Sequence, residues 1–478
     1  MMSEIRYVSI SDMHFGEEDS ILTNLVSGGM DVDPTKPSNC LKKLVDCLEF
    51  IINKFNKNKK PVLILNGDIL ELALSTMDIA AMAFGEFIKL TMKNGKELFD
   101  RIIFIPGNHD HHLWETARES QYINHIDNIK AGDRLELPRH TTNLFIDKQK
   151  KKVHSTILEN LIDKYSGIKK DVHVFYPNLG IMDENGKRCV IFTHGHYTEE
   201  IYTLMTLLKE LLFPKQELPK NINELEAENY AWIDFFWSTL GRSGEVGKNV
   251  ESVYEKLLYV KGQMDIIKRL ADGLAKQFDL PGWGDRWESW NMRFLLKHAF
   301  KYVSRRERID TGSALSFSTE EGLRKYVKVY LREQVYRELG YMPEDVTIVF
   351  GHTHKAFEKD MRNFPGYPKW VNIYNTGGWI VETTRPEPLH GGAIVLVDEE
   401  LNSVSLRMYN ESEEKEDYMV SVREARHGSE KSNPFYDEIS KIVNPEETPW
   451  SEFSKTVYSS IITREENLLE RIERRGYI

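Results

Sequence analysis

The stretch Pro61–Glu71 reads PVLILNGDILE and joins a short apolar run to an abrupt polar end. Val62–Leu65 is rich in branched side chains, which is typical of a strand buried on both faces. Gly67 lets the backbone turn sharply after this strand, so the carboxylate of Asp68 is presented at the edge of a sheet. The stretch therefore predicts an α/β fold with its chemistry beyond the carboxyl ends of the strands.

Four other apolar runs end in polar groups in the same way. Those groups are carboxylates, imidazoles and one amide, which are ligands for divalent transition metals. Because the carboxyl ends of such strands gather at one edge, five ends could converge on one cleft. The other four are Tyr7–Ser11 before Asp12-Met13-His14, Ile102–Ile105 before Pro106-Gly107-Asn108-His109-Asp110, Cys189–Thr193 before His194-Gly195-His196, and Val346–Phe350 before Gly351-His352-Thr353-His354.

The composition is that of a globular protein with a large core. The chain has 478 residues, a formal net charge of −11 and 41% hydrophobic residues, so more than one compact unit is expected. The acidic balance argues against a protein that coats nucleic acid through bulk charge. The N-terminus has no signal-peptide pattern, and no apolar run reaches membrane-spanning length. Three cysteines without a C-x-x-C pair indicate thiols in a reducing cytoplasm.

The order of the elements predicts two kinds of strand connection. Helical spacing in Leu41–Phe55 and Met77–Phe99 gives a β-α-β-α-β start with parallel crossovers. Asn185-Gly186 predicts a hairpin that joins Asn178–Met182 to Lys187–Thr193. Further expected elements are three strands that complete a second sheet and a terminal helix, at Val371–Tyr374, Gly392–Val397, Val404–Tyr409 and Trp450–Arg475.

The interval 197–342 has long helix-like segments and many aromatic residues. Aromatic residues at helical spacing usually pack on one another, which favours a helical insert with its own core. The alternative is a cap that offers apolar surface to a substrate. Four segments are expected: a first part of the core at 1–196, the insert at 197–342, a second part of the core at 343–410, and a charged connection with a C-terminal helix at 411–478.

Taken together, the five motifs resemble the metallophosphoesterase (calcineurin-like phosphoesterase) superfamily over roughly residues 5–200 and 345–400. The resemblance implies a four-layer α-β-β-α sandwich, here with a large helical insert. It also implies two divalent metal ions and hydrolysis of a phosphomonoester, phosphodiester or pyrophosphate by in-line attack of a metal-bound hydroxide. Manganese, iron or zinc would suit nitrogen and oxygen ligands.

The resemblance assigns seven residues to the ions. One ion would be held by Asp12, His14 and His354, the other by Asn108, His194 and His352, and Asp68 would bridge them. A shared carboxylate offsets the repulsion between two neighbouring cations. His196 is an alternative ligand to His194, or a residue that contacts the phosphate or lines the cleft.

The same resemblance makes His109 the general acid that protonates the departing oxygen, a role worth about 10²–10⁴ in rate. Asp110 is expected to be a structural carboxylate, or one that orients a histidine, rather than a direct metal ligand. His111 and His112 follow the motif at once and are expected either to be solvated or to contact the substrate.

Differences between subfamilies narrow the range of expected substrates. Serine/threonine protein phosphatases follow the Gly-Asp motif with an Asp-Arg pair, whereas here Gly67-Asp68 continues as Ile69-Leu70-Glu71-Leu72. The chain is similar to the lipid A pathway pyrophosphohydrolases in its Asp12 and Asp68 motifs, but they carry arginine where this chain has His109. The expected substrate is therefore a phosphorylated small molecule, nucleotide or lipid. A nuclease and a non-catalytic scaffold that binds a partner through the insert are the alternatives.

Overall fold

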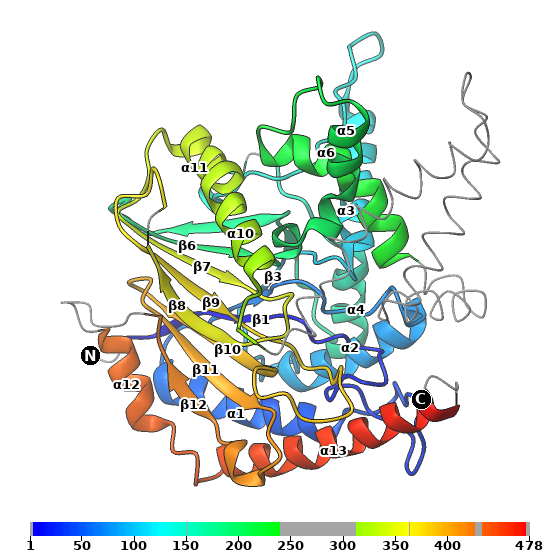
Figure 1. Cartoon of the computed structure of the whole chain (residues 1–478), viewed down its shortest axis with the longest axis vertical. Helices are drawn as coiled ribbons and strands as arrows, with labels where there is room; N and C mark the ends of the chain where they lie inside the picture. Colours follow the sequence, from blue (N-terminus) through cyan, green and yellow to red (C-terminus); the bar gives the residue numbers. More distant parts are fainter. Residues whose placement is uncertain (1–2, 150, 240–311, 363, 426–432, 475–478) are drawn as a thin grey trace.

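The computed structural model describes residues 3–149, 151–239, 312–362, 364–425 and 433–474. Two β-sheets pack face to face in it, and helices cover both outer faces (Figure 1). The four-layer α-β-β-α sandwich is therefore confirmed. Within these residues, no helix combines the length and the apolar character that crossing a membrane requires.

The larger sheet has seven strands in the order β12-β11-β10-β1-β2-β3-β4. Strands β1 to β4 run parallel, and their register aligns Ile10 with Leu65 and Leu65 with Phe104. β10 pairs antiparallel with β1, followed by β11 and β12. The bounds are β1 Ile5–Ile10, β2 Val62–Leu65, β3 Arg101–Phe104, β4 Val172–Val174, β10 Gly391–Asp398, β11 Ser403–Asn410 and β12 Ser421–Arg423.

The smaller sheet has five strands in the order β5-β6-β7-β9-β8. β6, β7 and β9 are parallel, while β5 and β6 form the hairpin that Asn185-Gly186 predicts. The bounds are β5 Asn178–Met182, β6 Arg188–Thr193, β7 Asp345–Phe350, β8 Phe357–Met361 and β9 Val371–Asn375.

The expectation that all three late strands complete this second sheet is wrong for two of them. β9 belongs to it, but β10 and β11 extend the larger sheet past β1. β10 is buried along its whole length, because helices cover one of its faces and the smaller sheet covers the other. An apolar strand pattern reports such burial, but it does not identify the partner strand.

Three cores separate the four layers. Along β2, Leu63 and Leu65 face the helices of the first outer layer, whereas Val62 and Ile64 face the smaller sheet. This alternation is the two-residue period of a strand, and the prediction that β2 is buried on both faces is confirmed. The third core lies between the smaller sheet and the helices of the insert.

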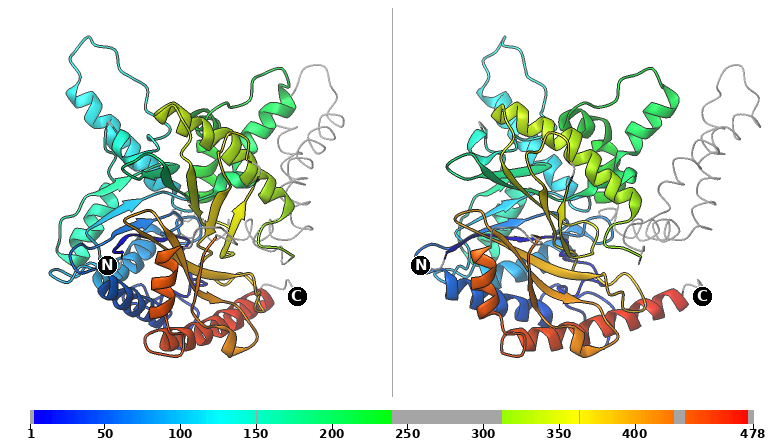
Figure 2. Two further views of the ribbon diagram at one scale, coloured as in Figure 1. Left: turned by 90° about the vertical axis from the view of Figure 1, so that its left-hand side faces the viewer. Right: turned by 60° about the vertical axis from the view of Figure 1, so that its left-hand side comes forward.

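The first outer layer consists of α1, α2, α4, α12 and α13, with α3 beside them. Ser38 caps α1 by accepting a hydrogen bond from the backbone N–H of Leu41 at 3.0 Å. The predicted terminal helix is present as α13, which runs along α1 (Figure 2) and packs Trp450 against Phe50. The bounds are α1 Asn39–Phe55, α2 Met77–Thr91, α3 His111–Asn128, α4 Thr156–Ser166, α12 Pro434–Ile442 and α13 Trp450–Arg474.

Residues 197–239 and 312–342, the described parts of the segment expected to be an insert, are largely helical. They supply the second outer layer, because side chains of α6, α10, η7 and α11 pack on the smaller sheet. Residues 240–311, with Trp283, Trp287 and Trp290, lie outside the described part. The bounds are α5 Leu204–Leu212, α6 Ile222–Trp232, η4 Ile233–Ser238, α10 Phe317–Lys325, η7 Tyr326–Leu331 and α11 Arg332–Leu339. Short helical turns occur elsewhere in the chain as well, and their bounds are η1 Ile146–Lys148, η2 His196–Thr198, η3 Glu200–Thr203 and η8 Lys415–Asp417.

Candidate metal centre

The loops that follow five strands meet at one place between the two sheets. The structure gathers the predicted ligands there in two groups: Asp12, His14 and His354 form the first, and Asp68, His194 and His352 form the second, joined by Asn108. Their side chains are at most 2% exposed. Residues more than 300 positions apart in the chain are thus neighbours in one buried site.

The first group places two imidazole nitrogens face to face. Nε2 of His14 lies 3.2 Å from Nε2 of His354, and that nitrogen lies 3.3 Å from Oδ1 of Asp12. The other nitrogen of each ring lies against a carboxylate: Nδ1 of His14 is 2.7 Å from Glu71, and Nδ1 of His354 is 3.2 Å from Glu382. Because a carboxylate beside Nδ1 favours the tautomer with the proton on Nδ1, two Nε2 lone pairs face each other, which a cation would stabilise.

The second group is centred on Nε2 of His194. This nitrogen lies 3.1 Å from Oδ1 of Asn108, 3.1 Å from Oδ2 of Asp68 and 3.3 Å from Nδ1 of His352. Nδ1 of His194 faces the backbone carbonyl of Asn66 at 3.2 Å, and Nε2 of His352 lies 2.9 Å from Glu199. Both rings therefore present one nitrogen to the group and hold the other against an oxygen acceptor.

These spacings fit metal coordination. Metal–ligand bonds of about 2.0–2.2 Å place neighbouring ligand atoms about 3.0–3.5 Å apart in tetrahedral or octahedral geometry. An oxygen acceptor behind each imidazole fixes its tautomer and its orientation, as carboxylates behind zinc-bound histidines do. The residues present therefore fit a divalent ion in each group.

The backbone is left-handed at the residues that carry these side chains. Six non-glycine residues among those described have positive φ, and five of them belong to the site: Asp12, His14, Asp68, His352 and His354. Such conformations cost about 1–3 kcal/mol each and persist at functional sites. They turn the side chains back from the strand ends toward a common point.

Two glycines allow the loops to approach one another. A Cβ on Gly67 would lie 2.3 Å from Nδ1 of His194, and one on Gly351 would lie 2.1 Å from Oδ2 of Asp12. Both positions therefore exclude any other residue unless the site moves.

Burial and charge set the protonation of the two groups. Burial raises the pKa of Asp68, but His194 and His109 outweigh it and hold that pKa well below the usual value. Burial lowers the pKa of His194, whereas Asp68 and Asp12 raise it, with a net value of about 9. A cation that binds here would displace this proton, so binding should release protons.

His109 lies beside the first group, with its ring centroid 4.8 Å from that of His14. Its Nδ1 lies 2.9 Å from Oε1 of Glu71, and its backbone N–H donates to Oδ1 of Asp68 at 2.8 Å. Among the described residues, its Nε2 has no hydrogen-bond partner. The imidazole thus has one anchored nitrogen and one buried nitrogen that makes no hydrogen bond to the described residues.

The remaining predicted residues have other places. The carboxylate of Asp110 accepts hydrogen bonds from the backbone N–H groups of Gly107, at 2.7 Å, and Ile69, at 2.7 Å. It therefore holds the loop of Asp68, which is a structural role, one of the two expected for it. His196 contacts Tyr176 through Nε2 at 3.3 Å and belongs to neither group, so the structure brings in His194 instead.

His111 and His112 were expected either to be solvated or to contact the substrate, and the structure contradicts the first expectation for His111. His111 is fully buried, and its Nε2 lies 3.0 Å from Glu226 of α6. Nδ1 of His112 lies 3.2 Å from Asp234 of η4. The first turn of α3 is thereby attached to the insert.

The sequence motifs did not identify the carboxylates that contact the outer nitrogens of the histidines. Glu71 follows Asp68 by three positions, and that short spacing is a usable signal. Glu199 follows the His194-Gly195-His196 motif by three positions but contacts His352, and Glu382 lies in the loop between β9 and β10, so only the fold shows which histidines they contact.

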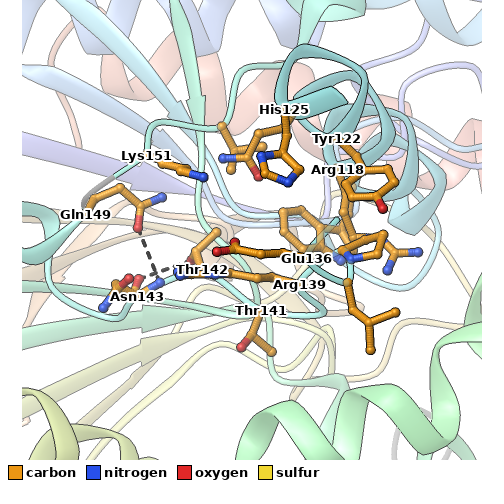
Figure 3. A pocket seen from close by; sticks show the side chains of 15 residues that line it. Arg118, Tyr122, His125, Glu136, Arg139, Thr141, Thr142, Asn143, Gln149 and Lys151 are labelled. Atoms are coloured by element: carbon orange, nitrogen blue, oxygen red, sulfur yellow. Dashed lines mark hydrogen bonds between the residues drawn. The ribbon is translucent and has the colours of Figure 1, made fainter. Parts of the chain in front are cut away.

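A separate pocket lies beside α3. It has a cavity volume of about 60 Å³ and is lined by α3 and the segment 136–153, with Arg118, Tyr122, Glu136, Arg139 and Lys151 around it (Figure 3). Neither group of ligand residues lines it.

The fold and the two groups define a mixed α/β class of protein with candidate metal-binding sites. Within that class, residues 5–236 match the family model of the calcineurin-like phosphoesterases, so the chain carries a calcineurin-like phosphoesterase domain. The resemblance drawn from the five motifs is confirmed, and the family supports metal-dependent hydrolysis of phosphoesters as the general activity. His352 and His354 lie beyond the matched residues. No curated protein matches the chain.

Proposed function

We propose that the chain is a binuclear metal-dependent phosphoesterase that hydrolyses a phosphomonoester, phosphodiester or pyrophosphate bond. The observation that carries the proposal is the pair of buried groups in which each histidine turns one nitrogen inward and holds the other against an oxygen acceptor. A core histidine needs no second imidazole nitrogen at 3.2 Å. That contact is expected where a cation is shared.

The proposed ligands follow the two groups. Asp12, His14 and His354 would hold one ion, and Asn108, His194 and His352 the other. The contact between Oδ2 of Asp68 and His194 supports Asp68 as a ligand of the second ion and as the proposed bridge to the first. The ions would be manganese, iron or zinc, which nitrogen and oxygen ligands accept. When bound, they would supply an ionised water as nucleophile and neutralise charge on the phosphoryl oxygens.

His109 is proposed to protonate the leaving oxygen. Glu71 accepts a hydrogen bond from Nδ1 of His109, which keeps a proton there and leaves the proton on Nε2 for transfer. After transfer, the neutral ring still donates from Nδ1 to Glu71. General acid catalysis of this kind contributes about 10²–10⁴ in rate.

The test is hydrolysis of an activated aryl phosphodiester with added manganese, together with metal content by mass spectrometry. We expect Asp68→Asn to abolish activity and to lower bound metal, and His109→Ala to lower activity while metal is retained. Asp398→Asn is a matched control, because Asp398 is buried at the other end of β1, opposite Ile5. Activity of Asp68→Asn equal to that of the wild type would refute the mechanism.

Two outcomes would indicate the alternatives. Wild-type protein that binds no metal and fails on a broad panel of phosphoesters would be a scaffold. Cleavage of single- or double-stranded DNA in preference to small phosphoesters would indicate a nuclease. A scaffold has no physical need for His109 to have its Nδ1 anchored and its Nε2 open.

A further inference from the structure

The helix that follows His109 lacks a cap from its own sequence. Asp110 occupies the N-cap position of α3, but its side chain makes no capping hydrogen bond. Its carboxylate is bonded to the backbone of Gly107 and Ile69 instead. The first N–H groups of a helix have no partner within the helix, so α3 needs a partner from elsewhere.

Ser238, at the end of η4 in the insert, supplies that partner. Its hydroxyl accepts a hydrogen bond from the backbone N–H of His112 at 2.9 Å and donates one to the backbone carbonyl of His109 at 3.2 Å. Ser238 is fully buried, so water does not compete for either bond. One hydroxyl therefore joins both sides of the turn that carries His109.

Two carboxylates of the insert reinforce this attachment. Nε2 of His111 lies 3.0 Å from Oε1 of Glu226, and Nδ1 lies 3.5 Å from Oδ1 of Asp234. Asp234 also lies 3.2 Å from Nδ1 of His112. Glu226 is fully buried and accepts a further hydrogen bond from the hydroxyl of Tyr176 at 3.0 Å. The insert thus contacts both the backbone and the side chains of the first turn of α3.

We propose that Ser238, supported by Glu226 and Asp234, is a positioning residue for the general acid, so that the insert completes the catalytic geometry. Within the described part of the chain, His109 has three polar attachments: Glu71 holds its ring, Asp68 holds its N–H and Ser238 holds its carbonyl. Two come from the core and the third from the insert. The inference rests on the proposed function, because the position of His109 matters for rate only if it transfers a proton.

The test compares Ser238→Ala with Thr239→Val across aryl phosphodiesters whose leaving groups differ in pKa. Thr239 is a half-buried neighbour whose hydroxyl, among the described residues, bonds to the carbonyl of Phe235, so the control removes a hydroxyl that does not bond to α3. A poor leaving group needs the proton more than a good one. We expect Ser238→Ala to lose about 10-fold in kcat/KM with a phenolate and less than about 2-fold with a nitrophenolate, as a misplaced catalytic group would.

A double-mutant cycle separates positioning from general destabilisation. In the His109→Ala background, Ser238→Ala should cause no further loss with the phenolate ester, because the group that it positions is gone. Equal losses for both leaving groups, or losses that add to that of His109→Ala, would overturn the inference and leave the proposed function intact. If His109→Ala itself shows no preference for good leaving groups, the acid assignment falls, and the inference falls with it.

Hydrogen exchange gives a readout that does not depend on activity. We expect the amide of His112 to lose protection in Ser238→Ala and to keep it in Thr239→Val, because only the first variant removes its acceptor. Unchanged protection of residues 107–116 in Ser238→Ala would overturn the inference whatever the kinetics show.

Discussion

Replacing Glu71 by glutamine changes the site at the residue that joins the metal centre to the acid. Oε1 of Glu71 accepts the backbone N–H groups of Ala73, at 2.8 Å, and Leu74, at 2.9 Å, while Oε2 lies 2.7 Å from Nδ1 of His14. A glutamine that keeps the two backbone bonds on its carbonyl oxygen must turn its NH₂ group toward His14. Two donors would then face each other, and His109 would lose the charge behind its ring.

The expected size follows from the two imidazole contacts. Hydrogen bonds to a charged group are worth about 1.5–3 kcal/mol, against about 1 for neutral ones. The loss at two rings is then about 1–4 kcal/mol, or about 5- to 900-fold in kcat/KM. Metal affinity should fall about 10- to 100-fold, as for other carboxylates behind metal-bound histidines. Metal titration of the metal-free protein and steady-state kinetics at saturating metal measure the two effects.

Glu411→Gln is the matched control. Glu411 is as buried as Glu71, but burial raises its pKa to about 8, so it is protonated at neutral pH and glutamine copies that form. In contrast, burial raises the pKa of Glu71 but His109 and His14 outweigh it, and the group stays charged. Wild-type metal affinity and kcat/KM in Glu71→Gln would refute the reasoning.

Three further predictions concern stability and backbone. Burial lowers the pKa of His111 but its carboxylate partners raise it, to about 9. The stabilisation of the fold by protonated His111 is therefore complete below about pH 6.5 and disappears as the pH rises through about 9. The difference in Tm between wild type and His111→Gln should close over that window. Gly67→Ala should abolish metal binding in a titration, because its Cβ would lie 2.3 Å from Nδ1 of His194. Gly340 has a similar φ but open space around it, so Gly340→Ala should lower the free energy of unfolding by only about 1–2 kcal/mol. Trp450→Ala should lower the free energy of unfolding by about 3–5 kcal/mol in a denaturant titration, since Trp450 is 1% exposed, and should leave kcat unchanged.

The ligand residues could be predicted from sequence because a local rule places them. Each follows an apolar run directly, and the carboxyl ends of such strands meet at one edge of a sheet. Asp68 and Asn108 follow neighbouring parallel strands, and His194 and His352 follow another neighbouring pair. The rule therefore needs no knowledge of the long segments in between.

The groups behind the ligands could not be found in this way. Glu199 lies beyond His196, and Glu382 lies in the loop between β9 and β10. Their distances to His352 and His354 depend on how two loops pack, which residue spacing does not report. The left-handed backbone of the site was equally hidden, since asparagine, aspartate and histidine tolerate positive φ but do not require it.

The attachment of α3 to the insert could not be predicted from the sequence either. His111 and His112 resemble solvated residues because they follow the motif in a polar stretch. Their partners Glu226 and Asp234 lie more than 100 positions away, on helices whose own spacing reports only an apolar face. Long-range polar pairing leaves no periodic signal.

The central position of β1 has a consequence for synthesis of the chain. One edge of β1 pairs with β2, which is made soon after it, but the other edge waits for β10, nearly 400 residues later. At 5–20 residues per second, that edge stays unpaired for roughly 20–80 s. An open apolar strand is a template for aggregation. The nascent chain therefore passes through a vulnerable period on the ribosome, and a chaperone that shields its N-terminal third should raise the yield of folded protein.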